Sequence, residues 1–434
     1  MTLMKETLRQ LVLAALEDLS LRRVMNEKIK CREGVLCWGD ERIELERYKK
    51  IVTIAIGKAA FQMAEVFAET VRPRTAGGLA VSSLSPPHQP DFVTYQGGHP
   101  YPNLESVQAA ERALEALSDL EPHHLVVYLL SGGGSAICEK PISDEISIDH
   151  LREFYRVLVT CGANIVQMNV LRKHFSAIKG GRLAERAFPA RQVTFYVSDV
   201  PPEQPSTVAS GPTMPDESTV GDTIEIAEKL GIVESLPTSI RGFFRDRRIP
   251  ETPKPGHEAF HGNSWFCLLD NQDGLNRLEN QVRSKGWVVE TDISVDDWPL
   301  ERAVDHLLAG LRKLRSNNPG RTVALLTGGE LSCPVIGDGQ GGRNQAFVLD
   351  CVEKIAGDNI AVVSAGTDGV DGNSPATGAV ADGSTLERAQ LSSLAPGDFA
   401  RRSDSYHFFE RLQDDLTTGP TGNNVRDLRL LVAW

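Results

Sequence analysis

The chain has 434 residues, which is enough for about two or three domains that each bury a core of their own. Apolar residues make up 41 % and charged residues 24 %, the composition of an ordinary soluble globular protein. The formal net charge of −12 argues against a nucleic-acid partner or an anionic membrane surface, because no excess of basic residues offsets the negative field. An anionic substrate would therefore need local lysine and arginine side chains.

The cysteines and the N-terminus indicate the cell compartment. The seven cysteines are odd in number, scattered and without a CxxC pair, which predicts reduced cytoplasmic thiols in place of a disulfide framework or a zinc site. Residues 1–20 carry apolar side chains at helical spacing with charges between them. That pattern predicts an amphipathic helix and neither a signal peptide nor a membrane span.

The first chemical motif follows the first apolar strand. A small hairpin is predicted over 35–45, and then the strand 51–56 runs directly into Gly57, Lys58 and a helix that continues to about residue 71. A glycine and a lysine at a helix N-terminus can bind a phosphate or a carboxylate, because free N–H groups and the helix dipole favour an anion there. An exposed lysine that only begins a helix is the equally common alternative.

A glycine run follows the next buried strand. Strands are predicted over 78–82 and 125–130, with a helix over 105–117 between them, and His99 lies in a Gly-His-Pro turn that we interpret as structural. Consecutive glycines allow several N–H groups to converge on one cluster of oxygens, and serines add hydroxyl donors. The loop is not a P-loop, because no GK[ST] closes it. We interpret it as a substrate or phosphate site rather than a plain tight turn, formed by Ser131, Gly132, Gly133, Gly134 and Ser135.

Basic residues gather between 169 and 184 in an otherwise acidic chain. Helical spacing would place Arg172, Lys179 and Lys173 near one side, flanking the hydroxyl of Ser176. A solvated charged face and a ligand site remain equally good explanations. We keep Arg172 and Lys179 as candidate substrate or phosphate ligands.

The first half ends in a carboxylate and a junction. The strand 193–197 leads to Asp199, which could hold Mg²⁺ through water or could simply cap a turn. The segment 236–261 is rich in proline, glycine and charge, and we interpret it as the domain junction. Repeated strand, loop and helix units predict an α/β fold with a parallel sheet covered on both faces.

The second half begins with a further series of strands and helices. The predicted elements are the strand 265–269, the helix 274–285, the strand 287–290, the helix 301–314 and the strand 322–326. A second apolar run, 331–336, is predicted as a strand that leads into a glycine-dense loop.

The glycine-dense loop reads IGDGQGGRNQAF and precedes a helix predicted over 344–355. Its position predicts an anion site at a helix N-terminus, with Gly339, Gly341, Gly342, Arg343 and Asn344 as phosphate ligands.

The same loop permits a rival function. Gly337, Gly339 and Gly342 also satisfy GxGxxG between a strand and a helix, and Asp368 ends the next strand near the place of a ribose-binding acid. A nicotinamide-dependent reductase is therefore an alternative, although Pro334 weakens the preceding strand and a reductase gives Arg343 no obvious role.

Two turns complete the chain. After the strand 360–365, Asp368 and Asp371 lie in the turn GTDGVDG, where they could share one hard cation, although Asp-Gly turns are commonplace. The turn TTGPTGNN precedes the last strand, 428–432. Loops that follow parallel strands collect at one sheet edge, so two domains could place these motifs across one cleft. Glycine N–H groups, lysine, arginine and carboxylates are what phosphoryl transfer requires.

The ordered motifs resemble a known family. IGKAA at 56–60, LSGGGSA at 130–136, N-x-x-RKH-x-S-x-IKGGRLA from Asn169, SDV with STVASGPT, TGGE, GGRNQ, AGTDGVDG and TGPTG-x-NV together resemble the type-II glycerate kinases, whose C-terminal part is called the MOFRL domain. The resemblance runs from about residue 4 to the last strand.

The resemblance implies an ATP-dependent kinase that acts on D-glycerate with Mg²⁺, generally giving 2-phosphoglycerate. It carries over Lys58 and Arg343 as catalytic residues, and Asp199 and Asp368 remain the candidate metal ligands. It also implies a Rossmann-like N-terminal domain, 1–240, and a smaller α/β C-terminal domain of MOFRL type, 255–434, with the active site in the cleft between them. The oligomeric state stays open, with a homodimer among the options.

The chain departs from the family pattern at several positions. Pro202 and Glu203 stand where a Gly-Asp pair follows SDV in the family, Ala346 stands where a glutamate follows GGRNQ, and a further aspartate is missing near Pro375. TGPTGTN has become TGPTGNN with Asn423. Fewer carboxylates could weaken metal binding or alter substrate choice. Some family members have been labelled hydroxypyruvate reductases, and a homologue that binds a small organic acid without turnover is a third option.

Overall fold

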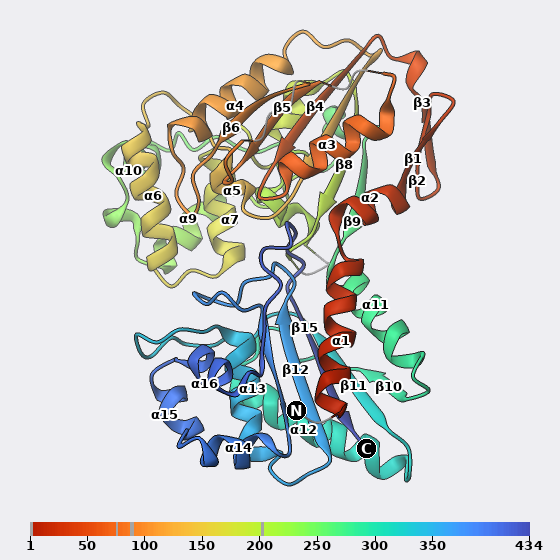
Figure 1. The fold of residues 1–434 in the computed structure, drawn as a ribbon. Helices are drawn as coiled ribbons and strands as arrows, with labels where there is room; N and C mark the ends of the chain where they lie inside the picture. Colours follow the sequence, from red (N-terminus) through yellow and green to blue (C-terminus); the bar gives the residue numbers. More distant parts are fainter. Residues whose placement is uncertain (1–2, 75–76, 87–90, 201–203) are drawn as a thin grey trace. The chain divides into compact units, whose positions relative to one another are not determined.

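The computed structural model describes residues 3–74, 77–86, 91–200 and 204–434, and these divide into two compact units (Figure 1). One unit is Leu21–Leu268, which we call the N-terminal unit. The other combines the first helix with Leu269–Trp434, and we call it the C-terminal unit. No helix within the described ranges is long and apolar enough to cross a bilayer.

The N-terminal unit contains a six-stranded sheet in the order β6-β5-β4-β7-β8-β9. The pairs β4–β5, β5–β6, β4–β7 and β7–β8 are all parallel, which agrees with the predicted α/β fold. Except for their first residues, β4 and β7 are buried along their whole length, as expected for strands that are covered on both faces. The strands are β4 (Lys50–Ile56), β5 (Gly78–Ser82), β6 (Phe92–Gln96), β7 (His124–Leu130), β8 (Arg191–Val197) and β9 (Ser264–Leu269).

Helices and a small separate sheet complete the N-terminal unit. The predicted hairpin is confirmed, because β2 (Val35–Trp38) pairs in antiparallel fashion with β3 (Glu41–Glu44) as well as with β1 (Ile29–Arg32). A second apolar core, separate from the sheet, packs Phe154 against Phe175 and Phe175 against Phe243. The helices are α2 (Leu21–Lys28), α3 (Ala60–Val71), α4 (Leu104–Ala116), α5 (Gly134–Ile137), α6 (Ile148–Thr160), α7 (Ile165–His174), α8 (Arg182–Ala187), α9 (Val220–Lys229) and α10 (Thr238–Arg245).

The C-terminal unit contains a mixed six-stranded sheet in the order β10-β11-β15-β12-β13-β14. Only β10 and β11 form a parallel pair, and β15, the last strand, lies antiparallel between β11 and β12. The carboxyl ends of β11 and β12 therefore share an edge with the beginning of β15. The strands are β10 (Val288–Thr291), β11 (Val323–Gly328), β12 (Ile360–Gly366), β13 (Gly378–Asp382), β14 (Asp415–Leu416) and β15 (Asp427–Ala433).

Helices cover both faces of this second sheet. Leu431 and Ala433 of β15 belong to the same core as the apolar residues of α12 and α13, whereas Leu428 contacts α11 near Gly274, because successive strand residues face opposite sides. The helices are α11 (Asn271–Arg283), α12 (Leu300–Asn317), α13 (Arg343–Lys354), α14 (Thr385–Leu391), α15 (Pro396–Arg401) and α16 (Ser405–Leu412).

The chain passes from one unit to the other after Ser20 and again after Leu268. Helix α1 (Leu3–Asp18) packs on α11, β12 and β13 of the C-terminal unit, where it buries Leu8 and Val12 completely. Its Lys5 is also fully buried and donates from Nζ to Asp414 at 2.8 Å. The residues from 241 to 268 stay with the N-terminal unit, since β9 extends that sheet beside β8.

Two predicted elements are wrong. Residues 331–336 form one isolated bridge, from Ser332 to Pro299, and Val335 and Ile336 are 81 % and 69 % exposed. Beyond this bridge the segment pairs with no strand of the described residues, and its Pro334 has no N–H to donate. The predicted basic helix ends at His174 instead of continuing towards residue 184.

Candidate active site

The first two motifs of the N-terminal unit form one structure. The turn after β4 lies beside the loop after β7, because these strands are parallel neighbours. The Lys58 N–H donates to the Gly132 carbonyl at 3.0 Å, and the Ala59 N–H donates to Ser131 Oγ at 3.1 Å. Gly57 has a φ of +124°, and a Cβ atom there would lie 2.4 Å from the Ser131 carbonyl oxygen. Only glycine fits this close approach.

Lys58 and His99 both lie close to Gly133 of the glycine run. A Cβ atom built on Gly133 would lie 3.2 Å from His99 Cδ2 and 3.3 Å from Lys58 Cγ. The Lys58 side chain is exposed, and its Nζ has no hydrogen-bond or ion-pair partner in the described part of the chain. Burial lowers the pKa of His99, and the positive charges of Lys58 and Arg172 lower it further. Burial and the two neighbouring cations therefore favour the neutral form of the imidazole.

Arg172, in the last turn of α7, is a buried cation that has no counter-ion within the described ranges. It is only 8 % exposed, and its guanidinium carbon lies 4.8 Å from the centre of the Tyr155 ring. Its Nε has no hydrogen-bond partner, and no acidic side chain among the described residues forms an ion pair with it. Burying a charge without a partner is costly, so such a side chain is a strong indication of an anionic ligand.

The SGGGSA loop is fixed by a second, strained segment. Ala209 and Ser210 adopt left-handed φ values of 50° and 59°, which non-glycine residues rarely do. Ser210 Oγ donates to Asn169 Oδ1 at 2.9 Å and shares a hydrogen bond with Ser135 Oγ at 2.7 Å. Ser131 Oγ likewise accepts the Ala59 N–H. Both predicted serine hydroxyls thus hold the loop in place.

Lys179 does not share a helix with Arg172, because α7 ends at His174, between the two residues. Its Nζ is 2.6 Å from Glu139 Oε2, and both side chains are 1 % exposed. Glu139 also accepts hydrogen bonds from Ser176 Oγ at 2.6 Å and the Tyr155 hydroxyl at 2.5 Å. The structure therefore gives Lys179 a contact inside the protein in place of the predicted contact with a ligand.

Asp199 packs directly on the glycine run. A Cβ atom on Gly132 would lie 2.3 Å from Asp199 Oδ2, so only glycine leaves room for the carboxylate. This contact brings a third predicted motif, SDV, to the same loop. The departures Pro202 and Glu203 lie outside the described residues.

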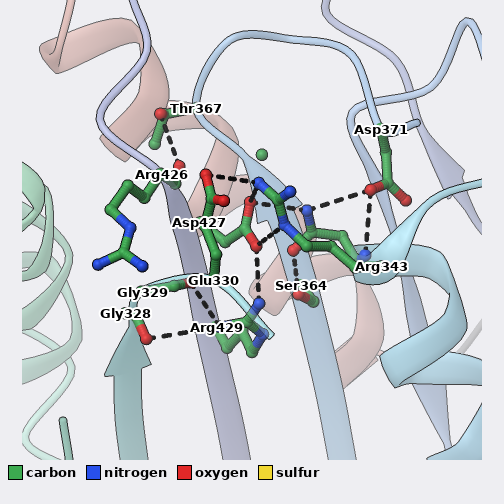
Figure 2. A network of polar contacts seen from close by, with 12 residues as sticks. Gly328, Gly329, Glu330, Arg343, Ser364, Thr367, Asp371, Arg426, Asp427 and Arg429 are labelled. Carbon is green, nitrogen blue, oxygen red and sulfur yellow. Dashed lines mark hydrogen bonds and ion pairs between the residues drawn. The ribbon is translucent and has the colours of Figure 1, made fainter. Parts of the chain in front are cut away.

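A second polar network lies at the shared edge of the C-terminal sheet (Figure 2). Arg343, the first residue of α13, donates from Nε to Asp427 Oδ2 at 2.6 Å and from Nη2 to Asp427 Oδ1 at 3.1 Å. The same Nη2 lies 2.9 Å from Glu330 Oε1. Asp427 is fully buried and also accepts from Arg429 Nη2 at 2.7 Å. Asn344 donates to Asp427 from its amide at 2.9 Å and accepts from Ser364.

In this network, contacts between opposite charges keep Arg343 and the buried Asp427 ionised. Burial opposes ionisation of Asp427, but the positive charges of Arg429 and Arg343 outweigh it and lower the pKa of that carboxyl. Burial alone would lower the pKa of Arg343, but the charges of Asp427 and Glu330 outweigh it and raise the pKa. The two side chains are therefore ionised together at neutral pH.

A strained residue leads the chain into this network. Arg426 has a φ of 71°, and its carbonyl accepts from the Thr367 N–H at 3.0 Å and from Thr367 Oγ1 at 2.7 Å. Its guanidinium binds Asp296 at 2.5 and 2.6 Å and points away from Asp427 in Figure 2. These contacts hold a conformation that is unfavourable for arginine and that begins β15 at Asp427.

Asp371 caps α13 rather than sharing a cation with Asp368. Its Oδ1 accepts the Asn344 N–H at 3.0 Å, and its Oδ2 accepts the Gln345 N–H at 2.8 Å. Burial raises the pKa of Asp371 to about 6. The N-terminus of α13, which was predicted to receive a phosphate, thus already holds a carboxylate of the protein. Asp368 Oδ1 accepts the N–H of Val370.

The glycine-dense loop contacts protein with its N–H groups. The Gly339 N–H donates to the Arg402 carbonyl and the Gly341 N–H to Asn373 Oδ1, both at 2.9 Å. A Cβ atom on Gly342 would lie 2.3 Å from Asp371 Oδ1, so this glycine makes room for the cap. Because β11 ends at Gly328 and residues 331–336 do not form a strand, the GxGxxG pattern does not directly follow a strand as it does in a dinucleotide site.

Several residues of the two networks were missed from the sequence. Glu139 gave no signal, whereas Glu330 lies within the quoted TGGE motif and could have been selected. Asp427 and Arg429 are charged residues at alternate positions of an otherwise apolar last strand, which was a usable signal of a polar cluster. Of the departures, Ala346 lies half-buried on α13 and Pro375 is exposed. Asn423 donates to the Leu19 carbonyl at 2.6 Å.

Comparisons with known proteins agree with the resemblance of the motifs. Residues 7–245 match a domain of unknown function, DUF4147, and residues 323–427 match the MOFRL family. The chain is 33 % identical to D-glycerate 2-kinase of Thermotoga maritima over 388 residues, 87 % of this chain and 89 % of that protein. It is 34 % identical to a putative hydroxypyruvate reductase of Agrobacterium vitis over 362 residues, 78 % of this chain and 76 % of that protein.

A solved structure extends the similarity to the whole fold. The crystal structure of glycerate kinase from Thermotoga maritima superposes with a TM-score of 0.85 at 30 % identity and covers 99 % of each chain. With both domain families and these relatives matched in order, the chain belongs to the glycerate 2-kinase family, with a DUF4147 N-terminal domain and a MOFRL C-terminal domain.

Proposed function

We propose that the protein transfers a phosphoryl group from ATP to D-glycerate and forms 2-phosphoglycerate. Membership of the glycerate 2-kinase family supports the reaction class. The observation that carries the proposal for this chain is Arg172, a buried guanidinium that has no counter-ion among the described residues and whose charge, with that of Lys58, acts on His99. An anionic substrate would supply the missing partner.

Arg172 is assigned to the glycerate carboxylate. A guanidinium binds a carboxylate through two parallel hydrogen bonds, and the Tyr155 ring against its face restricts its plane. Because the site is buried, the pair forms with little screening by water. The SGGGSA loop beside Lys58 would receive the phosphate groups through its N–H groups.

Lys58 and Arg343 are assigned to the charge that develops on the transferred phosphoryl group. Phosphoryl transfer depends mainly on positioning and charge stabilisation. Arg343 contacts Asp427 and Glu330 through Nε and Nη2, which leaves Nη1 outside these contacts. Two carboxylates thus fix the orientation of a donor that a phosphate oxygen could accept. That both side chains act on one substrate stays a prediction from the family resemblance.

The carboxylates fit Mg²⁺ only as single ligands. No cluster of three or more His, Cys, Asp or Glu side chains suits a metal in the part of the chain that the structure describes. Mg²⁺ in kinases is usually held by one or two carboxylates together with substrate phosphates and water. Asp199, on the glycine run, would hold it in this way, and Asp368 is the second candidate. When bound, Mg²⁺ neutralises charge on the ATP phosphates.

The first experiment measures ADP formation from Mg·ATP with and without D-glycerate. Glycerate-dependent ADP release supports the kinase. Oxidation of NADH or NADPH by hydroxypyruvate would support a reductase instead. Thermal stabilisation by glycerate without either turnover would indicate a binding protein and would contradict the proposal.

The second experiment tests the assignment of Arg172. Arg172→Met should raise the KM for glycerate by about 10² or more, because a buried charge-assisted pair is lost. Its free energy of unfolding without substrate should stay equal or rise, since an unpaired buried charge is removed. Arg156→Met is the matched control, because Arg156 also lies over a ring, that of Tyr101, at 5.8 Å. An unchanged KM in Arg172→Met would remove Arg172 from the site.

A further inference from the structure

Asn271 lies outside every motif but contacts the ends of two strands of the C-terminal network. It is the first residue of α11, whose N-terminus is already capped by Asp270 through a reciprocal capping box with Asp273. Its own side chain is therefore not needed for capping. Asn271 Oδ1 accepts the Gly329 N–H at 3.0 Å, and Nδ2 donates to the carbonyls of Val425 at 2.8 Å and Asp427 at 3.0 Å.

The amide of Asn271 takes the place of a missing rung between β11 and β15. The antiparallel register ends with Gly328 opposite Leu428, so Gly329 and Asp427 would form the next pair. Their N–H and C=O groups bind the two ends of the Asn271 amide instead. The strand ends are thus separated by one side chain that satisfies the polar groups of both.

The first glycine of the TGGE motif is explained by the same contact. A Cβ atom built on Gly328 would lie 1.8 Å from Asn271 Oδ1 and 2.8 Å from its Cγ. Every residue other than glycine would push the amide out of its position. The need for glycine in this motif is therefore set by Asn271, which lies 58 positions before Gly329 in the chain.

The separation of the two strand ends determines where the acidic partners of Arg343 lie. Glu330 follows the end of β11, and Asp427 begins β15. Arg343 reaches Glu330 at 2.9 Å and Asp427 at 2.6 Å at the same time. Moving either strand end would break one of these contacts.

We infer that Asn271 is a positioning residue for Arg343. Its amide fixes the spacing of Glu330 and Asp427 and, through them, the orientation of the guanidinium. The effect on turnover rests on the proposed kinase function, whereas the effect on Arg343 itself does not.

The test uses Asn271→Asp in the full-length protein. The substitution keeps one acceptor for the Gly329 N–H, removes both donors and places a negative oxygen beside two carbonyls. Asn276→Asp is the matched control, because it adds the same charge to an exposed position of the same helix. Asn271→Ser serves as the second variant if Asn271→Asp does not fold.

The direct readout is the ¹⁵N-labelled Arg343 Nε–H resonance, identified by its loss in Arg343→Ala. We expect it to shift or broaden in Asn271→Asp and to stay unchanged in Asn276→Asp. The kcat for glycerate-dependent ADP formation should fall by about 10², with a smaller change in the KM for glycerate, because a displaced group acts less well in the transition state. In an Arg343→Lys background, Asn271→Asp should lower the kcat much less than it does in the wild type.

Two results would overturn the inference. One is an unchanged Arg343 resonance in a folded Asn271 variant, and the other is an equal loss of kcat in the Arg343→Lys background, which would show that Asn271 acts independently. If the wild-type protein forms no ADP with glycerate, the proposed function fails, and the resonance alone then decides whether Asn271 positions Arg343.

Discussion

The buried pair of Lys179 and Glu139 gives the sharpest test of structure against sequence pattern. The sequence predicted Lys179 as a ligand group, whereas its Nζ lies 2.6 Å from Glu139 Oε2 with both side chains 1 % exposed. Lys179→Met removes the cation and leaves the carboxylate with two hydroxyl donors, Ser176 and Tyr155. Breaking one side of a buried pair typically costs about 3–5 kcal/mol, a large share of the roughly 5–15 kcal/mol that stabilise a domain.

The double variant separates the charge from the packing. Glu139→Gln combined with Lys179→Met leaves no buried charge at this position, so most of the lost stability should return, by about 2–4 kcal/mol relative to Lys179→Met alone.

Urea unfolding of the wild type, both single variants and the double variant, followed by circular dichroism, measures these free energies. The KM for glycerate of each folded variant is measured beside them. A Lys179→Met variant that is as stable as the wild type but has a raised KM would contradict the buried pair, because Lys179 would then contact the ligand as the sequence pattern suggested.

Three further predictions concern the two networks. Arg343→Ala should lose roughly three or more decades of kcat for glycerate-dependent ADP formation while the far-ultraviolet circular dichroism is unchanged, and near-normal turnover would remove Arg343 from the mechanism. Burial raises the pKa of Asp371 to about 6, so this carboxyl stabilises the folded protein most at a pH below its pKa in the unfolded chain. The free energy of unfolding should therefore fall by about 3 kcal/mol from about pH 4 to about pH 7. Asp371→Asn should lack this part of the pH dependence, and an equal pH dependence in both proteins would contradict the raised pKa. Gly57→Ala should lower the free energy of unfolding in urea by more than about 1–3 kcal/mol, because its φ is +124° and its Cβ would lie 2.4 Å from the Ser131 carbonyl oxygen. Gly162→Ala is the control, because Gly162 has a φ of +79° with nothing within 4 Å of its Cβ position, so only backbone strain should lower its stability. Equal losses of stability in the two variants would exclude the clash at Gly57.

Local patterns were sufficient for the N-terminal sheet and its edge. Repeated strand, loop and helix units predict a parallel sheet whose strand-end loops collect at one edge, and the parallel pairing of β4 with β7 places the Lys58 turn beside the SGGGSA loop. The strand β5 and the boundaries of β7 and α3 follow from the same local signals. The ordered motifs added the family to which the chain belongs.

The sequence patterns could not predict which side chains that are distant in sequence contact each other in the fold. Arg172 and Lys179 lie in one basic stretch of sequence but in different surroundings. Arg172 has no counter-ion among the described residues, whereas Lys179 is paired with Glu139. Spacing along a helix could not separate them, because the helix ends at His174. Burial of a charge depends on which distant side chain lies opposite.

By itself, the sequence determined an α/β chain with glycine-rich motifs at the ends of its strands, because those signals come from neighbours along the chain. Only the tertiary structure decided that β15 lies antiparallel between β11 and β12, which places Asp427 beside Arg343. It likewise decided that Asp371 caps α13 and that Asn271 separates two strand ends. Each of these contacts joins residues far apart in sequence, and pairing at that range depends on the packing of the whole sheet rather than on local preference.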